Sequence, residues 1–220
     1  MNEMQAISIR HSVRQFTDQP IEEGVLQELR QEIEAINEES GLSFRLFSNE
    51  PTAFDGFLAH FGKFQKARNY FALIGKRAED LEERVGYYGE RLVLKAVCLG
   101  LGTCWVGLTY QQKALRNLPL QDDEKLVLVI AFGYPANPGK PHKSKPLEKL
   151  SNLSPSSPDW FRDGVIAASL APTAINQQKF YIEYHDGEAK IIDKGGPFSQ
   201  VDLGIAAYHF EVGAKRKIQR

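Results

Sequence analysis

Residues 90–103 read ERLVLKAVCLGLGT, and this stretch joins the end of a long helix to the start of a buried strand. Apolar residues recur at helical spacing before it, which predicts the longest helix of the chain over Asp80–Leu99. Gly100 is typical of a helix C-cap and turn. The apolar run Cys104–Leu108 that follows predicts a buried strand. The stretch therefore predicts a helix, a tight turn and a strand in direct succession.

The other predicted elements alternate helices with few, short strands. We expect further helices over residues 3–9, Ile21–Ser40, Gln112–Asn117, Asp159–Leu170 and about 199–215, and strands over Ser43–Phe47, Tyr70–Ile74, Lys125–Phe132, Phe180–Tyr184 and Ala189–Asp193. Residues 134–158 are rich in Pro, Ser, Lys and Gly, which predicts a loop that crosses between two halves of the chain. This order predicts an α+β fold with helices packed on one mixed sheet.

A weak internal echo connects the two halves. The stretch LGIAAYHFEVG, residues 203–213, is an apolar helix closed by a glycine, like the stretch that ends at Gly100. On pattern alone, two ordinary core helices explain this echo better than a duplication does.

Composition excludes several classes of function. The 220 residues suffice for one large domain or two small ones, and a formal net charge of -1, with acids and bases interspersed, argues against nucleic-acid binding. No apolar run is long enough to cross a bilayer, and the N-terminus lacks the pattern of a secretory leader. The cysteines, Cys98 and Cys104, lie in apolar surroundings, and the five histidines show no metal-ligand spacing. We therefore expect a cytoplasmic protein without bound metal, nucleic acid or membrane.

A compact cluster of cationic and hydroxyl donors lies near the N-terminus, where residues 10–16 read RHSVRQF. In an extended segment, residues two apart point to the same side. Arg10, Ser12 and Arg14 are therefore expected to converge on one anion. A phosphate suits them, because guanidinium groups donate paired hydrogen bonds to its oxygens and the hydroxyl adds another. The alternative for an isolated cluster of this kind is a solvated turn.

Four stretches together resemble one family. They are RHSVRQF, GLGTCWVG at residues 100–107, GYPANPGKPHKSKPLEKL at residues 133–150 and SLAPTAINQQKFYIEY at residues 169–184. In this combination the chain resembles the nitroreductase family of flavin mononucleotide (FMN) enzymes. The resemblance implies an α+β sandwich of helices on a mixed, largely antiparallel sheet. It also implies a site of the kind that the family builds at the interface of a homodimer with two FMN sites.

The order of the motifs departs from that family. Its A-P segment should follow the first long helix, yet here it occurs in the second half, which in turn lacks an R-x-S-x-R stretch. We interpret the chain as a tandem repeat, a pseudo-dimer of two degenerate modules over residues 1–150 and 151–220. One composite flavin site would remain, and the two long helices would pair in one core. We expect a monomer, with a homo-oligomer as the alternative.

The resemblance implies roles for individual residues. Arg10, Ser12 and Arg14 match the family's phosphate and ribityl ligands, and Gly107 permits close approach of backbone to the flavin ring. The predicted flavin-binding residues are Arg10, Ser12, Arg14, Trp105, Val106, Gly107, Lys143, Lys145, Pro172, Thr173 and Asn176. Each group has a structural alternative: an ordinary loop cluster, a buried strand, a solvated lysine-rich loop or a turn that ends a helix.

The implied activity is that of an FMN-dependent oxidoreductase in which no side chain is catalytic, because the flavin carries the redox chemistry. NADH or NADPH would be the reductant in a ping-pong cycle. The acceptor would be a nitroaromatic, a quinone or a similar flat, electron-poor small molecule. Aromatic residues suggested for the acceptor pocket are Phe54, Phe57, Phe61 and Tyr110.

Two departures from the family motifs leave other functions open. The stretch QQKF, residues 177–180, replaces the family's Q-P-W, and Lys143 and Lys145 lack the planar fork of arginine. The alternative function is a non-catalytic or weakly active flavin-binding module that retains the fold, and another is a different reaction on the same fold. The basic C-terminus, AKRKIQR, is expected to be a solvated end.

Overall fold

The structure is a computed structural model that describes residues 1–51, 54, 62–108, 118–141 and 143–220. Its internal contacts divide the chain into two compact units. The sheet unit contains residues 10–81 and 92–140, and the α7 unit contains residues 1–9, 82–91 and 141–220. Helix α4, Leu81–Cys98, supplies residues to both units.

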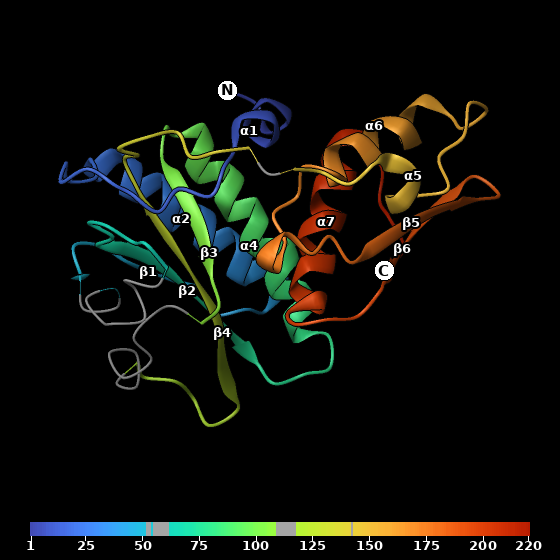
Figure 1. The fold of residues 1–220 in the computed structure, drawn as a ribbon. Helices are drawn as coiled ribbons and strands as arrows, with labels where there is room; N and C mark the ends of the chain where they lie inside the picture. Colours follow the sequence, from blue (N-terminus) through green and yellow to red (C-terminus); the bar gives the residue numbers. More distant parts are fainter. Residues whose placement is uncertain (52–53, 55–61, 109–117, 142) are drawn as a thin grey trace. The chain divides into compact units, whose positions relative to one another are not determined.

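The sheet unit is built on four strands in the order β1-β2-β4-β3, with every neighbouring pair antiparallel (Figure 1). Their bounds are Arg45–Phe47 for β1, Asn69–Lys76 for β2, Gly102–Val106 for β3 and Glu124–Gly133 for β4. The central strands β2 and β4 are the most buried, and the rings of Phe71 and Phe132 stack between them at 4.2 Å. Because consecutive residues of these strands are buried, both faces of each strand are covered. This explains why both strands are nearly continuous apolar runs.

Helix α2, Glu23–Ser40, is amphipathic. It buries an apolar stripe that consists of Leu26, Leu29, Ile33 and Ile36. Gly41 ends the helix in the left-handed region, with a φ of 68°, and its N–H donates to the carbonyl of Asn37. This is the C-cap that favours glycine, since a side chain at that φ would be strained.

The α7 unit surrounds one buried helix. Its elements are α1 (Glu3–Ile9), α5 (Leu147–Leu150), α6 (Asp159–Ala168), the 3₁₀ turn η2 (Ala174–Asn176), the hairpin strands β5 (Phe180–His185) and β6 (Glu188–Asp193), and α7 (Ser199–Ala214). Helices α1 and α6 and the hairpin pack against α7 (Figure 1). Because α7 is covered on several sides, it is apolar nearly all round rather than along one stripe.

Glycines allow α4 and α7 to touch backbone to backbone. A Cβ on Gly204 of α7 would overlap the carbonyl oxygen of Glu83 and lie 2.6 Å from the amide nitrogen of Tyr87. A Cβ on Gly86 of α4 would overlap the carbonyl oxygen of Val201 in the same way. The two long helices predicted to pair therefore do pack together within this unit.

A fully buried hydrogen-bonded pair, His209 and Glu90, crosses the same helix contact. His209 Nε2 lies 2.8 Å from Glu90 Oε1, and His209 Nδ1 lies 3.1 Å from the carbonyl oxygen of Ala167. Removing one partner of such a pair leaves a buried polar group unsatisfied, so the pair favours one register of α7 against its neighbours.

Three expectations need correction. The prediction of one mixed sheet is wrong, because β5 and β6 form a separate two-stranded sheet and the named strands pair only antiparallel among the described residues. The third strand ends at Val106 instead of Leu108. The short helix α5 lies inside the predicted loop. The predicted helix Gln112–Asn117 lies outside the described residues.

The C-terminus is also different from the expectation of a solvated end. Ile218 is buried, and Gln219 exchanges backbone hydrogen bonds with Ala189 and Ile191 at 2.9 Å. The ammonium of Lys217 donates to Glu211 at 2.8 Å and to the hydroxyl of Tyr87 at 2.9 Å. The backbone of this end is thus fixed along β6, while the basic side chains around it are exposed.

Among the helices that the structure describes, none is long and apolar enough to cross a membrane.

The division into modules 1–150 and 151–220 stays a prediction, since the two compact units are defined by contacts and say nothing about duplication.

Candidate functional site

The RHSVRQF segment of the sheet unit lies along β3. Ser12 pairs with Thr103 in a parallel bridge, and the amide of Val13 donates to the carbonyl of Thr103 at 2.8 Å. Gly102 makes this approach possible, because a Cβ there would lie 2.9 Å from the side chain of Val13. Gly102 of the GLGT stretch therefore allows direct contact between two motifs that lie about 90 residues apart in the sequence.

The charges of Arg14 and Arg10 and the hydroxyl of Ser12 influence the thiol of Cys104 in β3. Burial raises the pKa of this thiol, and the charges of Arg14 and Arg10 and a hydrogen bond from Ser12 oppose the rise. Arg10 is only 6 % exposed, whereas Arg14 is exposed. That two cations and a hydroxyl share one side of the segment stays a prediction from the alternation.

Hydrogen bonds on both sides hold the backbone of this segment. The amide of Gln65 donates to Arg14 at 2.9 Å, and the amide of Phe16 donates back to Gln65 at 3.1 Å. The amide of Ala136 donates to the carbonyl of Gln15 at 2.9 Å, and the Nδ2 of Asn137 donates to the Gln15 side chain at 2.7 Å. A backbone held in this way keeps its side-chain donors in fixed positions.

Trp105, Val106 and Gly107 continue the strand that carries Thr103. Val106 is buried, and Trp105 is half-buried opposite Ile130 of β4. Gly107 is the first residue after β3 and lies in a bend. The strand therefore ends on a buried residue and is followed directly by a residue without a side chain.

The other predicted ligands form a second cluster, within the α7 unit. The ammonium of Lys145 donates to the carbonyls of Gln177 at 2.6 Å and Gln178 at 3.0 Å, and the side-chain Nδ2 of Asn176 donates to the carbonyl of Lys143 at 3.1 Å. Two of the three Lys145 donors are thus used within the protein. Residues 173–178, named here the 173–178 loop, are bonded to the lysine pair.

Gln178 is a residue of this cluster that the sequence interpretation missed. Its side chain accepts from the amide of Lys145 at 2.7 Å and donates to the carbonyl of Lys143 at 3.0 Å and to Asn176 Oδ1 at 2.9 Å. Its own amide donates to the hydroxyl of Thr173 at 3.0 Å. The glutamine of the A-P-x-x-x-N-x-Q pattern was the available signal. Pro172 precedes the loop.

Asp202 of α7 is a second missed residue. Its carboxylate accepts from the amide of Ala174 at 2.9 and 3.2 Å and from the side chain of Gln177 at 2.7 Å. Burial raises the pKa of Asp202 to about 6, the bonds from Gln177 and Ala174 oppose the rise, and the charge of Asp193 adds to it. An acidic residue between the apolar residues Val201 and Leu203 was the sequence signal.

The raised pKa of Asp202 predicts a pH dependence of stability. Because the pKa is higher in the folded protein than its ordinary value of 3.8, the stabilising effect of protonation is complete below pH ~4 and is lost as the pH rises through about 6. Asp202→Asn should therefore reduce the fall in unfolding free energy between pH 4.5 and 7.5, by about 2 kcal/mol. Urea titrations of both proteins at the two pH values measure this, and equal falls would contradict it.

The 173–178 loop has an unusual backbone. Ile175, Asn176 and Gln178 have φ values of 46°, 57° and 45°, in the left-handed region. Ile175 is β-branched, the least suitable kind of residue there, and its side chain is 91 % exposed. Such a conformation costs about 1–2 kcal/mol and persists only where surrounding bonds enforce it.

Replacing Ile175 with asparagine should stabilise the protein by about 1 kcal/mol, because asparagine tolerates a positive φ and the exposed isoleucine packs against little. Thermal unfolding measures the change. Ile166→Asn is the matched control, since Ile166 is an exposed isoleucine in helix α6, where asparagine brings no such relief. A gain of the same size in both variants would refute the argument from strain.

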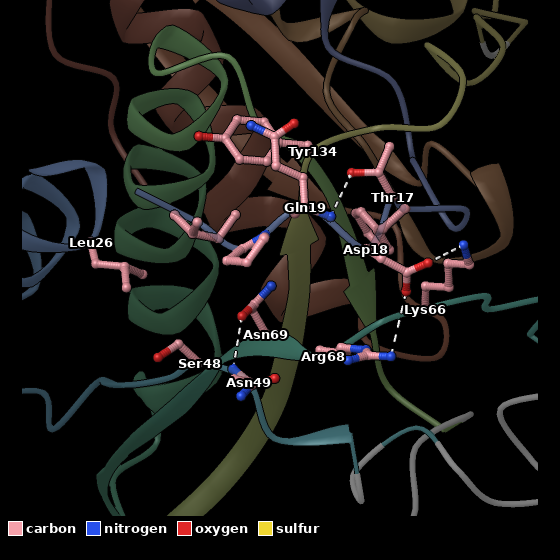
Figure 2. Close-up of a pocket in the computed structure, with 14 residues that line it drawn as sticks. Thr17, Asp18, Gln19, Leu26, Ser48, Asn49, Lys66, Arg68, Asn69 and Tyr134 are labelled. Carbon is pink, nitrogen blue, oxygen red and sulfur yellow. Dashed lines mark hydrogen bonds and ion pairs between the residues drawn. The ribbon is translucent and has the colours of Figure 1, made fainter. Parts of the chain in front are cut away.

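The sheet unit also contains a pocket of about 180 Å³, shown in Figure 2. Asp18 pairs with Lys66 and, at 3.4 Å, with Arg68 on one side of it. Asn69 accepts from the amide of Asn49 at 3.0 Å on another side. The described residues that line this pocket include none of the predicted flavin ligands.

The predicted acceptor-pocket residues Phe57, Phe61 and Tyr110 lie outside the described residues. Phe54 is described and packs in the core of the sheet unit against Phe64 and Tyr70.

Comparisons with known proteins agree with this fold. The family described as "Putative TM nitroreductase" matches residues 2–214. A putative nitroreductase from Thermotoga maritima is 26% identical, with a TM-score of 0.71 over 99% of this chain and 87% of that one. A putative nitroreductase in complex with FMN from Desulfovibrio desulfuricans is 21% identical, with a TM-score of 0.54 over 71% of this chain and 99% of that one. The second likeness concerns the fold alone. No curated protein matches the sequence.

Proposed function

The chain belongs to the family described as putative TM nitroreductase, and on this premise we propose that it is an FMN-dependent NAD(P)H oxidoreductase. The proposed reaction oxidises NADH or NADPH and reduces a flat, electron-poor acceptor such as a nitroaromatic or a quinone, in ping-pong order. The observation that carries the proposal is that the segment with Arg10, Ser12 and Arg14 lies directly along β3, bonded to Thr103 of the GLGT stretch.

This donor set fits the phosphate of FMN. Two guanidinium groups and a hydroxyl can donate several charge-assisted hydrogen bonds to a dianion. The fixed backbone of residues 12–16 means that little ordering is needed when the anion binds. The burial of Arg10 shields its charge from solvent, which strengthens its attraction for an anion.

When bound, FMN supplies the redox chemistry. The chain's own residues bind and orient it: the phosphate would contact Arg10, Ser12 and Arg14. By the sequence resemblance, the backbone of Trp105, Val106 and Gly107 is proposed to lie against the flavin ring. Gly107 directly follows β3 and has no side chain, which permits a close backbone approach.

For the α7 unit, the flavin-binding roles of Lys143, Lys145, Pro172, Thr173 and Asn176 stay predictions from the sequence resemblance. What supports them is that four of these residues belong to one hydrogen-bonded cluster. The origin of the chain as a tandem repeat and its monomeric state also stay predictions.

Incubation with FMN, removal of the excess and a visible spectrum with and without NADPH test the proposal. We expect a retained yellow chromophore that bleaches anaerobically when NADPH is added. Retained flavin that bleaches with neither NADPH nor NADH would refute the reductase and support a flavin-binding module. If no flavin is retained at micromolar protein, the proposal that FMN is the cofactor is refuted.

A further inference from the structure

The 173–178 loop needs an external anchor. Three of its six residues have a positive φ, and none of them is glycine. A loop of this kind does not hold its shape by local preference, because the same residues favour other conformations. Its shape therefore depends on the groups that bond to it from outside.

One such group comes from the first turn of α7. Both carboxylate oxygens of Asp202 accept from the amide of Ala174, at 2.9 and 3.2 Å, and Oδ2 also accepts from the side chain of Gln177 at 2.7 Å. The same Gln177 nitrogen donates to the carbonyl of Pro197 at 2.7 Å, just before α7 begins. Asp202 is 4 % exposed, so water competes little for these bonds.

The anchored residues surround the proposed flavin ligands in sequence. Ala174 lies between Thr173 and Asn176, and Gln177 directly follows Asn176. The amide of Asn176 donates to the carbonyl of Thr173 at 3.0 Å, and the amide of Gln177 donates to Ala174 at 2.9 Å. A shift of Ala174 would therefore move both proposed ligands.

We propose that Asp202 is a positioning residue that fixes the 173–178 loop from helix α7 and thereby holds Thr173 and Asn176 ready to bind the cofactor. The second half of this statement rests on the proposed function; the first half concerns the protein alone. The acid touches neither the cofactor nor the substrate and acts only through the loop.

Hydrogen exchange in the full-length protein without flavin tests the anchor directly. In Asp202→Ala, the amides of residues 174–178 should exchange about tenfold faster than in the wild type, because charge-assisted bonds to the loop are lost. Asp202→Asn keeps one acceptor oxygen and should lie between the two. Gln177→Ala removes one anchoring bond without a change in α7 and should also accelerate exchange.

Asp193→Ala is the matched control. Asp193 accepts from the amide of Gly195 and from Ser199 and Gln200 near the same end of α7, without a bond to the 173–178 loop in the described structure. In Asp193→Ala, the amides of the 173–178 loop should exchange at the same rate as in the wild type. Loop exchange unchanged in Asp202→Ala, or raised equally in Asp193→Ala, would overturn the anchor.

FMN affinity, measured by fluorescence titration, tests the role in positioning. We expect a dissociation constant about tenfold higher for Asp202→Ala and an intermediate value for Asp202→Asn, measured at a temperature at which circular dichroism shows each variant to be folded. Faster loop exchange with unchanged affinity would overturn the positioning role. If the wild type itself binds no FMN, the proposed function fails and the positioning role fails with it, while the exchange data still decide the anchor.

Discussion

Replacing Gly204 with alanine should lower the free energy of unfolding by about 3 kcal/mol or more. The added Cβ would overlap the carbonyl oxygen of Glu83 and lie 2.6 Å from the amide nitrogen of Tyr87. These are backbone atoms of α4, so the contact cannot be relieved by rotation of a side chain. The helices would have to separate, which would also disturb the buried pair of His209 and Glu90.

Urea unfolding followed by circular dichroism measures the loss, and Gly24→Ala provides the matched control. Gly24 also lies in a helix, α2, and a Cβ there would meet nothing within 4 Å. Alanine favours helix by about 1 kcal/mol over glycine, so the control should be neutral or slightly stabilised. Similar losses in both variants would show that the close contact of α4 and α7 is unimportant.

Replacing Arg14 with alanine should weaken FMN binding about 10- to 100-fold, which corresponds to the loss of one or two charge-assisted hydrogen bonds. Arg14 is the clearer probe of the proposed phosphate site, because it is exposed whereas Arg10 is buried. Its removal should therefore leave the fold intact. Arg14→Lys should give an intermediate affinity, since an ammonium keeps the charge without the planar fork.

Fluorescence titration with FMN measures these affinities. Arg30→Ala is the control, because it removes one exposed cation of the sheet unit, paired with Glu23 on helix α2. Arg30→Ala should bind FMN like the wild type at moderate salt, where charges far from the anion are screened. An affinity of Arg14→Ala within twofold of the wild type would place the phosphate elsewhere.

The elements with strong local signals were predictable from the sequence. Helices α2 and α4 follow apolar stripes that end at glycines, and their observed bounds lie close to the predicted ones. Strand pairing was harder to predict. Periodicity identifies β5 and β6 but says nothing about which other strands they join, and they form a sheet of their own.

The same distinction applies to the site. The spacing of Arg10, Ser12 and Arg14 indicates a shared side because alternation is a local property of extended chain. Asp202 and Gln178 were missed because local patterns do not show distant partners. Asp202 bonds to Ala174 and Gln177, and Gln178 bonds to Lys143 and Lys145, all between 25 and 35 residues away in the sequence. The pairing of the C-terminus was missed for the same reason, because the backbone partners of Gln219 are Ala189 and Ile191 of β6.

The shared helix α4 has a consequence for the synthesis of the chain. Residues 92–98 of this helix belong to the sheet unit, all of whose residues have been made once residue 140 is added, whereas residues 82–91 belong to a unit that ends only at residue 220. The nascent chain must therefore keep Gly86 and Glu90 without their α7 partners until the last helix emerges. A ribosome that stalls after residue 140 would present half a helix with an uncovered apolar face. During this interval the exposed apolar surface of α4 is a target for chaperones, and α7 covers it once α7 has been made.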